Sequence, residues 1–108
     1  MKLATLTLAA AALVALPAYA AIDNAQAEAL MKKDGCAACH SIDKKIVGPA
    51  YVDVAAKYKA DKNAQAMLEK KVKEGSVGVW GQIPMPPNAQ VPANDVKELV
   101  GWILTLKK

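Results

Sequence analysis

Cys36-Ala37-Ala38-Cys39-His40 places two cysteines three positions apart and a histidine directly after the second. This is the spacing at which a c-type haem is attached covalently. Each thiol adds to one haem vinyl group, and the adjacent histidine binds the iron as its proximal ligand. The stretch therefore predicts one haem c per chain, held by Cys36 and Cys39, with His40 as the first axial ligand.

Three other uses of a CxxC pair fit these residues less well. A zinc site needs about four nitrogen or sulfur ligands, and Cys36, Cys39 and His40 are the only cysteines and histidine in the chain. A thioredoxin-type dithiol is expected after a strand in a βαβ pattern, and no such strand is predicted before Cys36. A structural disulfide would leave the adjacent His40 as a coincidence.

The first twenty residues have the pattern of a signal peptide. Lys2 supplies a positive start, Leu3 to Leu16 is an apolar run broken only by two threonines, and residues 17–20 end in an A-x-A cleavage site. The run is shorter than the roughly 17 to 20 residues of a spanning helix. We expect cleavage near Ala20/Ala21, a periplasmic location and a single domain over residues 21–108.

The length and charge of the chain limit the classes of protein to which it can belong. A domain of this length is close to the limit at which an apolar core alone is stable, and a buried haem would supply the missing core. The chain has 14 lysines and no arginine against 10 acidic residues, for a net charge of +4. Without an arginine cluster, nothing indicates nucleic-acid binding. The lysines either steer an acidic partner or solvate helix faces.

We predict an all-α fold of about four short helices around the haem, with no strand. The first follows a capping box at Asp23 and Gln26 and ends at Gly35. The second follows Pro49, and the third begins after Asp61 or Asn63 and ends at Gly75. The last begins near Pro92, with Asp95 in its first turn and Lys107-Lys108 at its C-terminal dipole. Apolar residues recur at helical spacing in each segment.

Residues 75–92 contain too many glycines and prolines for a regular element. A loop of this length in a small domain is uncommon unless it is functional. Because it carries Val77, Val79, Trp80, Ile83 and Met85, which suit a disordered spacer poorly, we expect it to cover the haem.

The second axial ligand must come from elsewhere, since His40 is the only histidine. Met31 lies about one turn before the haem motif on the same helix, which hinders its reach to the other haem face. Met67 belongs to the apolar face of the third helix, where filling the core is the simpler role. Met85 stands between Pro84 and Pro86, on backbone held in an extended geometry. We predict Met85 as the sixth ligand.

Each of three further positions has two possible roles. The turn at Val47-Gly48-Pro49 is the nearest stretch that could offer a carbonyl to the histidine ring, or it is only a turn. Trp80 donates its indole N–H to a haem propionate or simply packs. Asn88 forms a hydrogen bond near the Met85 sulfur or serves as a turn residue.

The chain resembles the small bacterial class I cytochromes c, in particular the cytochrome c-551/c-552 group. The resemblance covers essentially all of residues 21–108 and is carried by C-A-A-C-H, V-G-P-A-Y, G-S-V-G-V-W-G, I-P-M-P-P-N and a closing W-I-L helix. It implies thioethers at Cys36 and Cys39, axial ligands at His40 and Met85, a carbonyl from Pro49 to His40, a propionate contact from Trp80 and an Asn88 side chain near the Met85 sulfur. Family members often carry arginine before the glycine at position 75, where this chain has Lys71.

The resemblance implies a soluble, monomeric, non-enzymatic carrier of single electrons. Its partners would be periplasmic reductases, oxidases or a quinol-oxidising complex, docked transiently. The alternative function is a haem enzyme or gas-binding protein with an open distal site. The position of the haem motif near the N-terminus and the lack of a distal His or Arg argue against it. A haem subunit of a larger complex would show the same sequence features.

Overall fold

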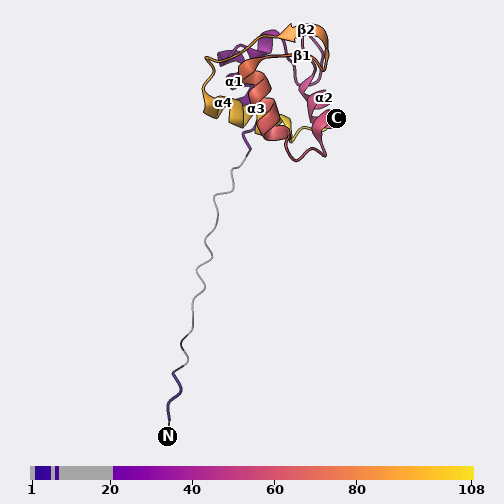
Figure 1. Cartoon of the computed structure of the whole chain (residues 1–108). Coiled ribbons are helices and arrows are strands. Elements are labelled where there is room, and N and C mark those ends of the chain that lie inside the picture. The colour runs from indigo at the N-terminus through magenta and orange to yellow at the C-terminus, as the bar shows by residue number, and fades with distance from the viewer. Residues whose placement is uncertain (1, 6, 8–20) are drawn as a thin grey trace.

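The computed structural model describes residues 2–5, 7 and 21–108 (Figure 1). The predicted signal peptide, residues 1–20, lies largely outside this part of the chain. Among the described residues, no helix is long and apolar enough to cross a membrane. The elements in order are α1 (Asn24–Lys33), a 3-10 turn η1 (Cys36–Ala38), α2 (Tyr51–Tyr58), α3 (Ala64–Glu74), β1 (Ser76–Gly78), β2 (Gly81–Met85) and α4 (Ala93–Ile103).

The predicted capping box begins α1. The Asp23 carboxylate accepts the Gln26 backbone N–H at 2.8 Å, and the Gln26 side chain accepts the Asp23 N–H at 2.9 Å. The helix ends as expected, because Gly35 takes a left-handed conformation with φ of 82° that side chains disfavour. This turn leads the chain directly from α1 into η1.

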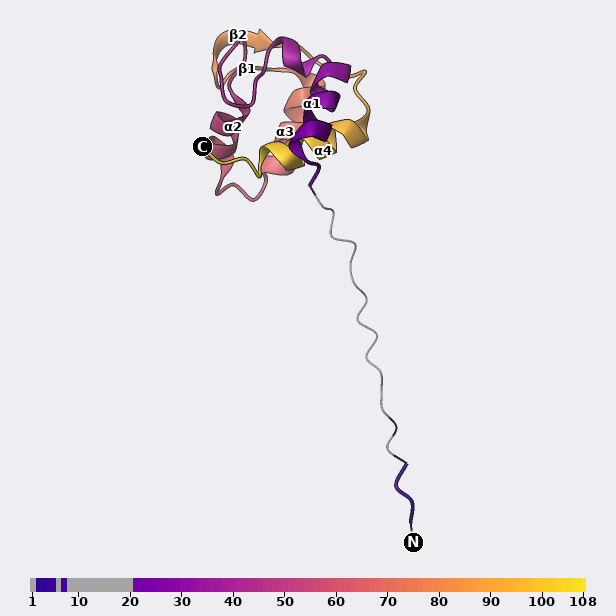
Figure 2. The ribbon, with the colours of Figure 1, turned by 180° about the vertical axis from the view of Figure 1, so that it is seen from behind.

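As predicted, α4 begins near Pro92, which is the residue directly before the helix. The expected interaction of Lys107 and Lys108 with the C-terminal dipole was wrong, because the helix ends at Ile103 and both lysines lie beyond its last turn. Lys108 instead pairs with Asp53 of α2 at 2.7 Å, and the C-terminus lies beside α2 in opposite views (Figures 1 and 2). An ion pair with another element took the place of the predicted dipole interaction.

The core forms where α1, α2 and α3 pack against α4. The apolar face of α4 recurs at positions i, i+3, i+4 and i+7, which places its members on one side of the helix. Trp102 extends this face, and its indole N–H donates to Asn24 of α1 at 3.0 Å. The buried cluster consists of Ala27, Met31, Tyr51, Val54, Leu68, Val91, Val96, Leu99, Val100, Trp102 and Ile103.

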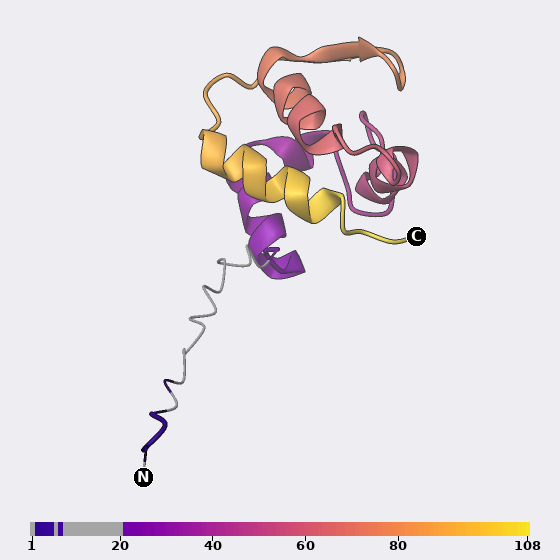
Figure 3. The same cartoon turned by 60° about the horizontal axis from the view of Figure 1, so that its bottom comes forward.

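The expectation of no strand was wrong for the segment after α3. β1 and β2 form an antiparallel hairpin that pairs Ser76 with Met85 and Gly78 with Gly81. Gly78 and Gly81 take the positive φ values of 96° and 116° that reverse the chain at either side of the Val79-Trp80 turn. Figure 3 shows α3 between this hairpin and α4. Strands of three and five residues are too short to show the alternation of apolar and polar residues that predicts a strand, and glycines and prolines interrupt this segment.

Two acidic side chains meet where α1 ends beside the start of α4. Lys33 binds Asp95 at 2.9 Å, whereas one carboxylate oxygen of Asp34 is buried without a hydrogen-bond partner. Burial, followed by the neighbouring Asp95, raises the pKa of Asp34, and Lys33 partly opposes this shift. The hydrogen bond from Lys33, in contrast, lowers the pKa of Asp95. The charged form of Asp34 is therefore disfavoured in the folded protein.

Asp34→Asn is expected to raise the midpoint of thermal unfolding at pH 7. A raised folded-state pKa favours folding below the unfolded value, which is about 3.9 for Asp, and this contribution is lost as pH rises through the folded pKa. The advantage of the neutral variant should therefore shrink when unfolding is followed at pH 3. Asp43→Asn, at an exposed position, is the control. A lower midpoint for Asp34→Asn at pH 7 would contradict the assignment.

Candidate functional site: an apolar pocket with two thiols and one imidazole

A pocket of about 210 Å³ lies among the helices and the hairpin. Its lining is mostly apolar and comes from η1, α2, α3, β1, β2, α4 and the segments between them. All the site residues predicted from the sequence line this single pocket: Cys36, Cys39, His40, Pro49, Trp80, Met85 and Asn88. The fold thus brings together residues that are up to 52 positions apart in the chain.

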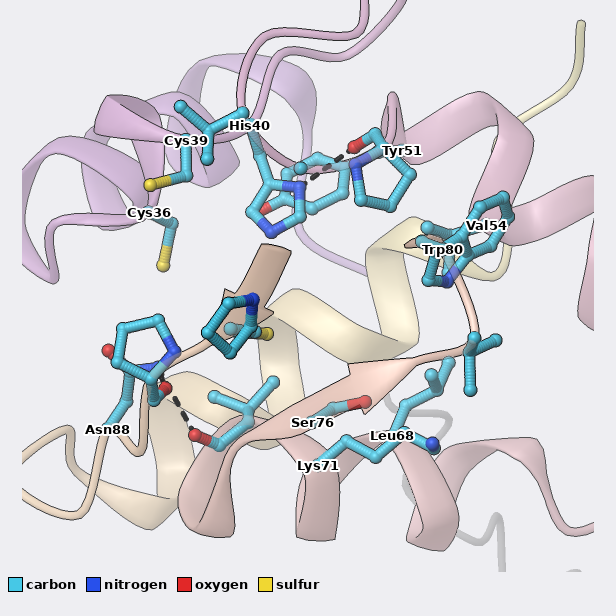
Figure 4. A pocket seen from close by; sticks show the side chains of 18 of the residues that line it. Cys36, Cys39, His40, Tyr51, Val54, Leu68, Lys71, Ser76, Trp80 and Asn88 are labelled. Carbon is cyan, nitrogen blue, oxygen red and sulfur yellow. Dashed lines mark hydrogen bonds between the residues drawn. The ribbon is translucent and has the colours of Figure 1, made fainter. Parts of the chain in front are cut away.

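His40 is held in one orientation at the pocket wall. Its Nδ1 lies 2.8 Å from the Pro49 carbonyl oxygen. Because a carbonyl can only accept, Nδ1 carries the proton, and Nε2 keeps its lone pair. Figure 4 shows the other ring nitrogen directed into the pocket, on the side of the two cysteines. This tautomer is the one that can bind a metal through Nε2.

Gly48 gives the imidazole the room that it needs. A Cβ atom at this position would lie 2.6 Å from His40 Cε1, and 3.0 and 3.1 Å from the two ring nitrogens. Gly48 has no positive φ, so its backbone would accept other residues. The requirement for glycine here comes from the close approach of the 47–49 turn to the ring.

Both cysteines are partly buried and free of a disulfide. The η1 turn presents them, with the Cys39 and His40 amides donating to the Cys36 carbonyl at 3.1 and 2.9 Å. Burial, and then the nearby Asp34, raises the pKa of the Cys36 thiol, while a hydrogen bond from Tyr51 lowers it. Two thiols that face an apolar pocket beside an imidazole suit covalent attachment of a flat apolar group. Among the described residues, no three His, Cys, Asp or Glu side chains form a metal-ion cluster.

Met85 lies at the end of β2 and lines the pocket. The segment that holds Met85 packs closely against Gly75. A Cβ atom on Gly75 would lie 2.8 Å from the Met85 carbonyl oxygen and 3.0 Å from the Pro87 nitrogen, and its φ is 83°. Asn88 binds the same segment to α3, because its side chain donates to the carbonyls of Val72 at 3.2 Å and Pro86 at 3.0 Å. Contact of Asn88 with the Met85 sulfur stays a prediction.

Trp80 lies at the tip of the hairpin and remains 41% exposed. The Lys57 ammonium group lies 5.7 Å from the centre of its ring, within the range of a cation–π interaction. Lys71, at the position where an arginine was expected from the resemblance, also lines the pocket. The propionate contact of Trp80 stays a prediction.

Comparison with known proteins assigns this arrangement. The sequence model of the cytochrome c family matches residues 24–107. The chain belongs to the cytochrome c family. It is 62% identical to cytochrome c-551 of Allochromatium vinosum over 71% of this chain and 82% of the relative. It is also 51% identical to cytochrome c-552 of Nitrosomonas europaea over 99% of this chain and all of the relative.

Solved structures agree with the sequence relatives. The crystal structure of the Nitrosomonas europaea cytochrome c-552 superposes with a TM-score of 0.71 at 55% identity, over 74% of this chain and 99% of that chain. A class 1 cytochrome from Sideroxydans lithotrophicus covers 82% of this chain and all of its own, with a TM-score of 0.65 at 33% identity. The predictions of a class I cytochrome c fold and of the c-551/c-552 group are confirmed.

As a cytochrome c, the protein binds haem c covalently, carries electrons and is not an enzyme. The residues of the pocket fit that group: two free thiols, an imidazole with an available Nε2, a thioether and an otherwise apolar lining. Haem c supplies a one-electron couple at its iron. Gly48 and Tyr51 were not predicted as site residues, because in the sequence they belong to a turn and to a helix, and only the fold brings each of them against His40.

Proposed function

We propose that this cytochrome c is exported, loses residues 1–20 and carries single electrons in the periplasm on a haem with His40 and Met85 as axial ligands. The observation that carries the ligand proposal is that both side chains line one apolar pocket, with the imidazole already held as the Nδ1–H tautomer. An iron with both axial positions filled by the protein transfers electrons and has no site for a substrate. The A-x-A site at the end of the apolar leader supports export.

The chain's own residues prepare the pocket for this task. Pro49 holds the proton on Nδ1 of His40 and so leaves the Nε2 lone pair available. Gly75 and the flanking prolines fix the backbone that presents Met85. Apolar side chains exclude water, which limits the rearrangement of solvent when the charge of the iron changes by one. Cys36 and Cys39 keep the group attached through each cycle.

The docking face that we propose consists of exposed apolar side chains on the hairpin and on the turn near His40. They are exposed by 41 to 68%, and all except the first also line the pocket: Ile46, Val47, Val77, Val79, Trp80 and Ile83. Residues 21–108 carry 13 lysines and 10 acidic residues, a net charge of +3. This face therefore suits brief docking to redox proteins that carry an apolar patch inside an acidic rim. Periplasmic reductases, oxidases or a quinol-oxidising complex are the partners we propose, with the carrier acting as a monomer.

Optical spectra of the purified holoprotein in both oxidation states test the proposal. We expect a low-spin ferric iron with a weak sulfur-to-iron charge-transfer band at the edge of the near infrared. The ferrous protein should bind carbon monoxide slowly, because Met85 must leave first. A high-spin native spectrum, or rapid carbon monoxide binding, would instead identify an open distal site and a gas-binding or enzymatic role.

A further inference from the structure

Lys57 lies within reach of two aromatic rings at the end of α2. Its ammonium group is 5.7 Å from the centre of the Trp80 ring and 5.8 Å from the centre of the Tyr58 ring. Both distances are in the range at which a cation is attracted to the face of an aromatic ring. Tyr58 packs against the core, and Trp80 lies in the turn of the hairpin. The two rings therefore restrict where this positive charge lies, although the side chain is exposed.

This charge lies beside the docking face. Trp80 belongs both to that face and to the lining of the pocket. Figure 4 shows Trp80 at the edge of the pocket, on the side that α2 forms with Val54. Among the described residues, the ion pairs involve other lysines: Lys33, Lys70 and Lys108. Contact with aromatic rings does not neutralise an ammonium group, so the charge of Lys57 is available to an anion.

We propose that Lys57 is the cation that steers an acidic redox partner onto the docking face, with a carboxylate of the partner meeting the ammonium group where Trp80 lines the pocket. This deepens the proposed function and rests on it. An exposed charge pair adds little affinity, but it speeds the encounter of two proteins and selects their orientation. Lys57 differs from a lysine that only solvates a helix, because its charge is held against a ring that lines the pocket.

Lys57→Gln tests this steering through the oxidation of the ferrous holoprotein by two small oxidants of opposite charge. In each reaction the ferrous haem gives one electron to the oxidant, which leaves ferric haem with either ferrocyanide or tris(phenanthroline)cobalt(II). At low ionic strength, loss of the positive charge should slow oxidation by ferricyanide, a trivalent anion, about threefold. It should speed oxidation by the trivalent cation tris(phenanthroline)cobalt(III) by a similar factor. Both differences should fade at about 1 M salt, where the Debye length is about 3 Å.

Lys59→Gln is the matched control. It removes the same charge two positions further on, where the backbone is still helical, so Lys59 lies on a different side of α2. We expect it to change both rates much less than Lys57→Gln does. Lys57→Arg keeps a cation that can stack on Trp80 and should preserve the parent rates. Equal effects of Lys57→Gln and Lys59→Gln would overturn the proposal.

The opposite charges of the oxidants separate steering from a structural role. The reduction potential of each variant is measured in parallel, so that rates are compared at equal driving force. A loosened hairpin would change both rates in the same direction, and that result in Lys57→Gln would overturn the proposal.

Poly-L-glutamate tests whether the anion at Lys57 is a carboxylate, as on an acidic protein. It should compete with ferricyanide and slow the oxidation of Lys59→Gln more than that of Lys57→Gln. Equal slowing of the two variants would overturn the proposed carboxylate contact.

These outcomes differ from a failure of the proposed function. If His40 and Met85 were not the axial ligands, the parent protein would already show a high-spin spectrum or rapid carbon monoxide binding. If only the steering by Lys57 failed, the parent would be low-spin, and Lys57→Gln would match Lys59→Gln with both oxidants.

Discussion

Met85→Ala is expected to abolish the sulfur-to-iron charge-transfer band and to open the sixth coordination position. The thioether favours the ferrous iron, so its loss should lower the reduction potential by a substantial part of the roughly 0.8 V range that axial ligands span. The reduced variant should bind carbon monoxide rapidly, without the delay set by ligand release. Optical and near-infrared spectra, redox titration and stopped-flow mixing with carbon monoxide measure these changes.

Met67→Ala provides the matched control. Met67 is on α3 and packs partly buried against the core, and it does not line the pocket. Its truncation should cost about 1–2 kcal/mol of unfolding free energy, below the 2–5 kcal/mol seen for fully buried methionine. The charge-transfer band should remain. Loss of the band in Met67→Ala, with the band intact in Met85→Ala, would refute the ligand assignment.

Gly48→Ala is expected to displace the His40 ring although it adds only one methyl group. Carbon atoms in contact normally lie 3.5–4.0 Å apart, and the new Cβ would be 2.6 Å from Cε1. The ring must tilt or the turn must retreat, and either movement weakens the 2.8 Å bond from Nδ1 to Pro49. We expect a loss of about 1–3 kcal/mol in unfolding free energy and changed ferric haem-methyl NMR shifts.

Gly101→Ala is the contrasting substitution. Gly101 lies inside α4, has no positive φ, and a Cβ there would approach only the Gln65 side chain, at 3.7 Å. Alanine should stabilise the helix by roughly 0.5–1 kcal/mol and leave the spectrum unchanged. If Gly48→Ala also left both the stability and the haem-methyl shifts of the holoprotein unchanged, the turn would not restrict His40 as described.

Helix positions were readable from the sequence because their signals are local. The Asp23 and Gln26 capping box lies within one turn, and Gly35 and Gly75 end helices through their own backbone conformations. The hairpin was missed because its strand pairing joins Ser76 to Met85 across an intervening turn. The partner of Lys108 was missed for a similar reason, since Asp53 is more than fifty positions away. Interactions between distant residues leave no periodic pattern in the chain.

In the candidate site, too, the local features were predictable from the sequence and the contacts between distant residues were not. The five consecutive residues from Cys36 to His40 predict the cofactor, since its covalent attachment motif places the two thiols and the imidazole close together in the sequence. Met85 could be selected because the chain has one histidine and few methionines, and prolines flank only this one. Trp80 and Asn88 line the pocket as expected, but their individual contacts with the haem and with the Met85 sulfur stay predictions.

The order of residues alone predicts the chemistry of this protein: a haem c attached at Cys36 and Cys39, with an imidazole beside it. Tertiary structure decides how that chemistry is held. Only folding brings the Pro49 carbonyl within hydrogen-bond distance of His40. Only folding also packs the Gly48 Cα against the His40 ring and stacks the Tyr51 ring on it. The physical reason is that bonding and spacing are properties of neighbouring residues, whereas ring orientation, steric room and burial depend on segments that meet only when the helices pack.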